Sequence, residues 1–180
     1  MRRRRPSSRG AAGAAEVGGE TGPGVPTAHR PPAPVRPSAE LRSLPGRLEW
    51  NAALDRESAR AARYGRPASV AIVELKAERA NQPVDPFLPS LAGPIARAIR
   101  QDSRATDLVA RVASARFQIL LPETTEAGAE RLAERVAANC RRHIEATGAP
   151  VTVRVSVAGT GLDDSLHEAL AHALRSIEAA

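Results

Sequence analysis

The chain has 180 residues, enough for one domain and a tail, and its apolar content must come mainly from Ala, Leu, Val and Ile because aromatic residues make up only 2%. Its formal charge is +6, but residues 1–40 carry +4 of this and residues 41–180 only +2, so the basic total does not indicate a nucleic-acid-binding domain. The single cysteine, Cys140, excludes an intrachain disulfide and a Cys-based metal site, and without a transmembrane run or a signal-peptide core we expect a cytoplasmic protein.

Residues 1–40 are rich in Arg, Pro, Gly, Ala and Ser and contain almost nothing to bury. The repeated prolines exclude a helix of useful length, so this composition predicts a disordered tail. One interpretation is a solvated extension, which is what charged runs usually are. The other is that Arg2–Arg5 and Arg9 contact nucleic acid, anionic lipid or an acidic protein.

Residues 41–180 alternate between helical and strand patterns. The expected elements are, in order, a helix to about Arg63, a strand over Ser69–Leu75, a helix over Leu91–Gln101, a hairpin over Leu108–Leu121, a helix over Glu123–Ala146, a strand over Val151–Val157 and a last helix from Leu166 to Ile177, capped by Asp163 or Asp164. We expect Pro94 to be tolerated only in the first turn of its helix. The order predicts an α/β (α+β sandwich) domain with a mixed central sheet, a β-hairpin and flanking helices.

The strand over Ser69–Leu75 is apolar at nearly every position, which predicts a central strand covered on both faces. The strand over Val151–Val157 instead alternates valine with polar residues, which is typical of a half-buried strand. Between the two hairpin strands, Ala113–Arg116 reads as a tight turn, although it lacks an Asn-Gly or Asp-Gly pair.

These elements, in this order, resemble the GGDEF domain of diguanylate cyclases over about residues 41–180. Six stretches carry the resemblance. They are Leu44–Arg47, similar to the family's L-P-N-R opening, Arg63–Pro67 with the first strand after it, Asp107–Arg111 with Phe117 and Leu121-Pro122 around the signature loop, Ala133–Val136, similar to the next helix, Val151–Val157, similar to V-T-V-S-I-G-V, and Leu174–Ala180, which falls on the final helix. The resemblance implies a nucleotide-cyclase-like sheet with this hairpin at its centre.

The signature itself is replaced. Its five positions fall on Ala113, Ser114, Ala115, Arg116 and Phe117, so only the phenylalanine remains. In the family the glycines let the backbone approach GTP, and the acidic residue helps to hold two metal ions. Ala115 offers no side-chain oxygen to a hard cation, and Arg116 adds a positive charge.

The other positions that the resemblance assigns to the active site have also changed. Glu74 aligns with the first metal-binding Asp, Lys76 with the second, and Gln82 with the guanine-holding Asn, with Asn81 one position away. Phosphoryl transfer depends on metal ions and on positioning. We therefore expect no cyclase activity, no catalytic residue, no bound metal and no cofactor.

A second family feature is an R-x-x-D site for the product, cyclic di-GMP. Arg104 and Asp107 occupy that register, and Arg135 aligns with an arginine of the following helix. An arginine fork can bond the O6/N7 edge of guanine and also suits phosphate, while Asp107 can accept from guanine N–H groups. The leading hypothesis is a signalling domain that binds cyclic di-GMP.

The alternative is a protein–protein interaction or scaffold domain with no nucleotide ligand, whose partner is a signalling protein and whose tail contacts anionic partners. In that case Asp107 only caps or orients the start of the strand, and Arg135 is a solvated side chain.

Two further features carry no chemistry. His167 and His172 are five residues apart, so they cannot share a metal ion on one helix face, and Cys140 lies in an apolar stripe.

Overall fold

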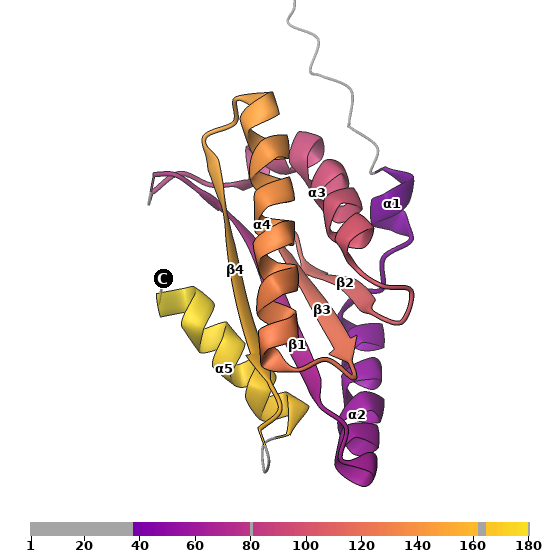
Figure 1. Ribbon diagram of the computed structural model, residues 1–180. Helices are drawn as coiled ribbons and strands as arrows, with labels where there is room; N and C mark the ends of the chain where they lie inside the picture. The colour runs from indigo at the N-terminus through magenta and orange to yellow at the C-terminus, as the bar shows by residue number, and fades with distance from the viewer. Residues whose placement is uncertain (1–37, 80, 162–164, 180) are drawn as a thin grey trace, which may run out of the picture. The chain divides into compact units, whose positions relative to one another are not determined.

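The computed structural model describes residues 38–79, 81–161 and 165–179, so the predicted tail up to residue 37 and the proposed Asp163 or Asp164 cap lie outside the described residues. The elements are α1 (Ala39–Arg42), α2 (Arg47–Tyr64), β1 (Ala68–Ala77), the 3-10 turn η1 (Asp85–Phe87), α3 (Leu88–Asp102), β2 (Leu108–Ala113), β3 (Arg116–Pro122), α4 (Glu126–Thr147), β4 (Val151–Gly159) and α5 (Leu166–Ala179) (Figure 1). From α2 onward, the predicted order of helices and strands is confirmed.

The four strands form one sheet in the order β2-β3-β1-β4. This confirms the predicted fold class, a sheet with flanking helices, but the expectation of a mixed sheet is wrong because all three strand pairs are antiparallel. Each helical crossover skips one position in the sheet. α3 connects β1 to β2 with β3 between them, and α4 connects β3 to β4 with β1 between them, so parallel strands never become neighbours.

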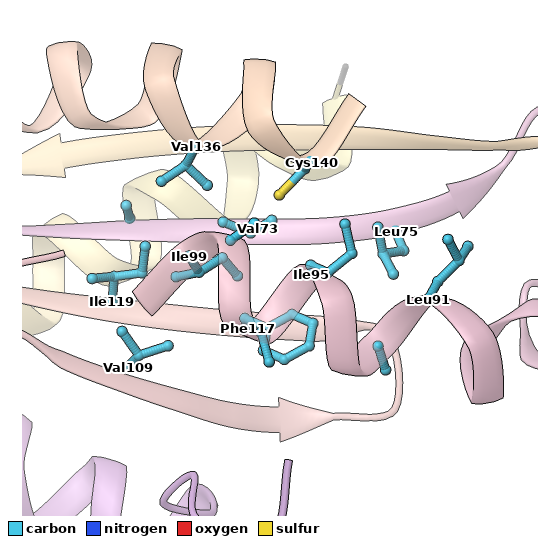
Figure 2. Packing of buried hydrophobic residues seen from close by; sticks show 14 of the residues in the cluster. Val73, Leu75, Leu91, Ile95, Ile99, Val109, Phe117, Ile119, Val136 and Cys140 are labelled. Atoms are coloured by element: carbon cyan, nitrogen blue, oxygen red, sulfur yellow. The ribbon is translucent and has the colours of Figure 1, made fainter. Parts of the chain in front are cut away.

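Helices cover both faces of this sheet, as the burial of β1 indicates. Alternate residues of β1 belong to two separate cores: Ala71, Val73 and Leu75 pack with α3 and α4, whereas Val70 and Ile72 pack with α2 and α5. Figure 2 shows side chains of α3, α4 and the strands meeting in the first core. β1 is therefore covered on both faces, as its apolar sequence predicts.

Two helix starts differ from the prediction. α3 begins at Leu88 with Pro89 in its first turn, so Pro94 lies inside the helix and lacks the N–H that would bond the carbonyl of Ser90. The helix nonetheless continues because its apolar face is fully buried, with Leu91 and Ile95 at 0% exposure.

α4 begins at Glu126 rather than Glu123. Glu123 has a φ of 49°, in the left-handed region, and its carboxylate is held by Arg60 at 2.6 Å and by Arg66 at 3.6 Å. The chain therefore turns at this residue, and Thr125 caps the helix by accepting from the Gly128 N–H.

α5 is capped by Ser165, which exchanges hydrogen bonds with Glu168 in a capping box. The Ser165 N–H donates to the Glu168 carboxylate at 2.7 Å, and the Glu168 N–H donates to the Ser165 hydroxyl at 3.3 Å. The Ser165 hydroxyl also donates to this carboxylate. The bonds from the Ser165 N–H and from the hydroxyl together hold the pKa of Glu168 below its ordinary value.

Cys140 is fully buried on α4, between that helix and the sheet (Figure 2). Burial, and to a lesser extent the negative charge of Asp102, raises the pKa of its thiol to about 12. The thiolate is the reactive form, so we expect a colorimetric thiol reagent at pH 8 to leave the native protein unlabelled and to label one equivalent after unfolding in urea. Rapid labelling of the native protein would contradict this placement.

Candidate functional site

The turn between β2 and β3 contains Ala113–Arg116, positions that the resemblance assigns to the signature, and is closed by three contacts. The Leu75 N–H donates to the Ala115 carbonyl at 2.9 Å, and the Arg111 guanidinium donates to the Ser114 carbonyl at 3.2 and 2.5 Å. A register shift between Arg111 and Ala113 leaves Val112 as an extra residue on β2. The predicted turn is therefore present beside the strand that bears Glu74, although it lacks the two glycines of the family's signature.

Glu74 is paired with two cations. Arg116 lies directly opposite it on β3, and its guanidinium donates to Glu74 Oε1 from Nη2 at 2.6 Å and from Nε at 3.1 Å. The Lys76 ammonium lies 3.4 Å from the second oxygen, Oε2, which has no hydrogen bond of good geometry. The carboxylate is thus neutralised from both sides.

These residues do not fit a metal ion. The one carboxylate at this position is ion-paired, and Ala115 supplies no oxygen ligand. In the described part of the chain, no group of three or more His, Cys, Asp or Glu side chains is placed to hold a metal. Around the end of β1, a pocket of about 440 Å³ is lined by Gln82 and by the charged residues Lys76, Glu78, Arg79 and Arg154, so the surroundings of Gln82 are more basic than acidic.

The Arg116–Glu74 pair should contribute to stability because Glu74 is 9% exposed. Replacing Arg116 with alanine removes two charged hydrogen bonds from a largely buried carboxylate, and we expect a loss of about 1.5–3 kcal/mol in the free energy of unfolding. Arg97→Ala is the matched control, since Arg97 reaches Glu40 over the same 2.6 Å but both side chains are more exposed. Urea denaturation should show a clearly smaller loss for that control because its ion pair is exposed to solvent, and equal losses would contradict the account.

The structure brings the three residues of the R-x-x-D hypothesis to one small pocket. Arg104 and Asp107 come from the loop between α3 and β2, and Arg135 from α4; all three line a cavity of about 100 Å³. The lining of this cavity also includes Leu121 near the end of β3 and Gly128 near the start of α4. Residues 31 positions apart in sequence are thus neighbours around one cavity.

Asp107 holds this loop and keeps one oxygen unpartnered. Its Oδ2 accepts from the Arg104 N–H at 2.7 Å, and its own N–H donates to the Arg104 carbonyl at 3.1 Å. Its Oδ1 is shielded from solvent and has no hydrogen-bond partner. A buried carboxylate oxygen without a donor is unfavourable, so a ligand N–H that reached it would be stabilised.

Two charged residues of the pocket were missed by the sequence analysis. Arg131 lies one helical turn before Arg135 on α4, and Asp102 ends α3 and accepts from the Asn139 side chain. Arg131 could have been found from the sequence, because its i, i+4 spacing from Arg135 places both side chains on the same face of the helix. With Arg104, the three arginines outnumber the two aspartates, and no ion pair with a carboxylate is found for any of these arginines in the described part of the chain.

Comparison with known proteins identifies the family and the fold. A family model described as "Diguanylate cyclase, GGDEF domain" matches residues 40–180. The chain belongs to this family. No curated protein matches the chain of this GGDEF domain.

Several solved structures share the fold of this GGDEF domain. The FimX GGDEF domain from Pseudomonas aeruginosa is 18% identical, with a TM-score of 0.65 over 79% of this chain and 91% of that one. The GGDEF domain of DgcB from Caulobacter crescentus, in complex with c-di-GMP, is 16% identical, with a TM-score of 0.62 over 81% and 91%. Diguanylate cyclase SiaD from P. aeruginosa, in complex with its activator SiaC, is 23% identical, with a TM-score of 0.64 over 79% and 56%, so this chain spans little more than half of the SiaD chain.

Two remaining sequence features can be placed in this GGDEF domain. The Nε2 atom of His167 lies 2.8 Å from Oδ1 of Asp55 and so links α5 to α2, while His172 is exposed on α5. None of the helices in the described ranges is long and apolar enough to cross a membrane.

Proposed function

We propose that this GGDEF domain is a catalytically inactive signalling domain that binds cyclic di-GMP at the pocket of Arg104, Asp107 and Arg135. The observation that supports binding is the convergence of these residues on one cavity, where neither arginine has an ion pair with a carboxylate of the described residues, although the Arg135 guanidinium donates to the Arg131 carbonyl at 3.1 Å. The observation that supports inactivity is the Arg116–Glu74–Lys76 cluster, which takes the place of a metal site. Signalling then depends on ligand binding rather than on turnover.

The chemistry of the pocket suits a guanine nucleotide. An arginine fork can donate to both O6 and N7 of guanine, and the unpartnered Asp107 Oδ1 can accept from the N1–H and N2–H groups once the side chains that cover it move aside. The remaining arginines suit the phosphates. DgcB, which shares the fold, is described in complex with c-di-GMP, and this supports the choice of ligand.

The size of the pocket sets an expectation for affinity. A cavity of about 100 Å³ is small beside the ~300–1,000 Å³ of typical ligand sites, so it takes the edge of one base and leaves most of the dinucleotide on the surface. We therefore expect micromolar rather than nanomolar binding. Calorimetric titration of cyclic di-GMP into the full chain should give saturable heat in this range, whereas no heat at high protein concentration would reject the proposal.

The second candidate is an interaction domain without a nucleotide ligand. One observation favours it: Asp107 Oδ2 accepts from the Arg104 N–H, which is the orienting role that needs no ligand. SiaD, a relative in fold, is described in complex with an activator protein. Absence of heat with cyclic di-GMP would leave this candidate in place.

The division into a tail over residues 1–40 and a domain over 41–180, like the cytoplasmic location, remains a prediction. So does contact of the tail with anionic partners. Deleting residues 1–37 leaves the described domain whole and tests the contact of the tail with anionic partners. If the shortened chain shows the same salt-dependent binding to DNA or anionic vesicles as the full chain, this contact is rejected.

A further inference from the structure

The pocket of Arg104, Asp107 and Arg135 offers one unpartnered acceptor to a base. Of the two Asp107 oxygens, Oδ2 already accepts from the Arg104 N–H at 2.7 Å, so only Oδ1 is without a donor. The second carboxylate of the lining, that of Asp102, accepts from the side-chain amide of Asn139. Guanine carries its N1–H and N2–H donors along one edge, so this single oxygen is satisfied by the edge of a single base.

The size and lining of the cavity also limit it to one base. Its volume is about 100 Å³, against ~300–1,000 Å³ for typical ligand sites. Its large apolar lining residues are Leu121 and Leu132, and in the described part of the chain no aromatic side chain lines it. The second base of a cyclic dinucleotide therefore has neither space inside the cavity nor an aromatic ring there to stack on.

Positive charge around this cavity exceeds negative charge. Arg104, Arg131 and Arg135 line it together with two carboxylates. Guanidinium groups donate to phosphate oxygens with their fork of N–H groups. A phosphate monoester carries about −1.5 to −2 charge near pH 7, more than the single charge of a phosphodiester, so the phosphate of a linear nucleotide suits these arginines at least as well as that of a cyclic one.

We propose that this pocket binds guanine nucleotides through one base edge and one adjoining phosphate, so that linear guanosine monophosphate (GMP) is a ligand of the same site. This inference rests on the proposed function, because it uses the same pocket. It extends the class of ligand from the cyclic dinucleotide to linear guanylates. The base edge and the phosphate are common to both kinds of ligand, and they are the two groups that the acceptor and the arginines of this pocket match.

Asp107 is the residue that selects the base. N1 of guanine carries a hydrogen that can donate to Asp107 Oδ1, whereas N1 of adenine is an acceptor and would place a lone pair against the carboxylate. Guanine O6 can accept from an arginine, but adenine carries a donor amino group at that position. We therefore expect GMP to bind about 5- to 150-fold more tightly than AMP.

Calorimetric titration of the full chain with cyclic di-GMP, GMP and AMP, each by itself, tests the class of ligand. We expect saturable heat with GMP and a dissociation constant within about tenfold of that for cyclic di-GMP, because the second guanosine stays on the surface. Heat with cyclic di-GMP but none with GMP would overturn this inference and leave the proposed function in place. Heat with GMP alone would support this inference and reject the proposed function, and no heat with either would overturn both.

Asp107→Asn tests the selection of the base. The asparagine oxygen can still accept from the Arg104 N–H, while its amide nitrogen takes the place of Oδ1 and turns an acceptor into a donor. This donor opposes guanine N1–H but matches adenine N1, so we expect the preference for GMP over AMP to be lost. Far-UV circular dichroism monitors the fold, and the titrations of the wild-type chain remain decisive if this variant does not fold.

Asp85→Asn is the matched control. Asp85 is exposed in η1 and does not line the pocket, so its replacement removes the same charge away from the site. This variant should keep the wild-type preference for GMP. An unchanged preference in Asp107→Asn, or an equal loss of preference in Asp85→Asn, would overturn the proposal.

Discussion

Replacing Arg104 with alanine is expected to weaken cyclic di-GMP binding by about 5- to 150-fold. This range corresponds to the ~1–3 kcal/mol that a two-pronged arginine–guanine contact contributes. The loop itself should survive, because Asp107 accepts from the backbone N–H of residue 104 and not from its side chain. Calorimetric titration of wild-type and variant chains measures the effect.

The control is Arg100→Ala on α3. Arg100 is exposed, lies four residues before Arg104 and does not line the pocket, so its loss removes the same charge without touching the site. Its binding constant should stay near that of the wild type. If both variants bind equally well, the ligand is not held at this pocket.

Replacing Phe117 with alanine is expected to remove about 3–5 kcal/mol from the free energy of unfolding. Phe117 is the one signature residue that remains, and it is 0% exposed in the core formed with α3 and α4 (Figure 2). Against a total stability of about 5–15 kcal/mol, this loss brings the domain close to unfolding. The change in midpoint of a urea titration measures it.

Ser114→Ala is the companion variant in the same signature. The Ser114 side chain is exposed, and the contact made by this residue is through its carbonyl, which alanine retains. We expect a change within about 0.5 kcal/mol. Similar effects of the two variants would mean that Phe117 has no special packing role.

The helices and strands could be predicted because their signals are local. Apolar periodicity identified α4 and β4, and end signals such as Gly65 and Gly148, both with positive φ, marked the helix ends. α1 has four residues and no buried side chain, so it had no comparable signal. The direction of strand pairing also could not be predicted from periodicity, because it depends on which strands become neighbours.

The candidate site was predictable in part. Arg104 and Asp107 lie three positions apart, so the resemblance located them together. The contribution of Arg135 depends on how α4 packs beside the loop, and the Arg116–Glu74 pair depends on the register of β3 against β1. Both are long-range features, which local sequence patterns do not determine.

We propose that this GGDEF domain keeps the fold of the family while the Arg116–Glu74 ion pair stands where the resemblance places a metal site. The most direct test of this proposal is incubation of the purified full chain with GTP and Mg²⁺, followed by chromatographic measurement of cyclic di-GMP. We expect no product above a protein-free blank, because Glu74 is occupied by Arg116 and Lys76. Product that forms with the wild-type chain and disappears with Glu74→Gln would contradict the account.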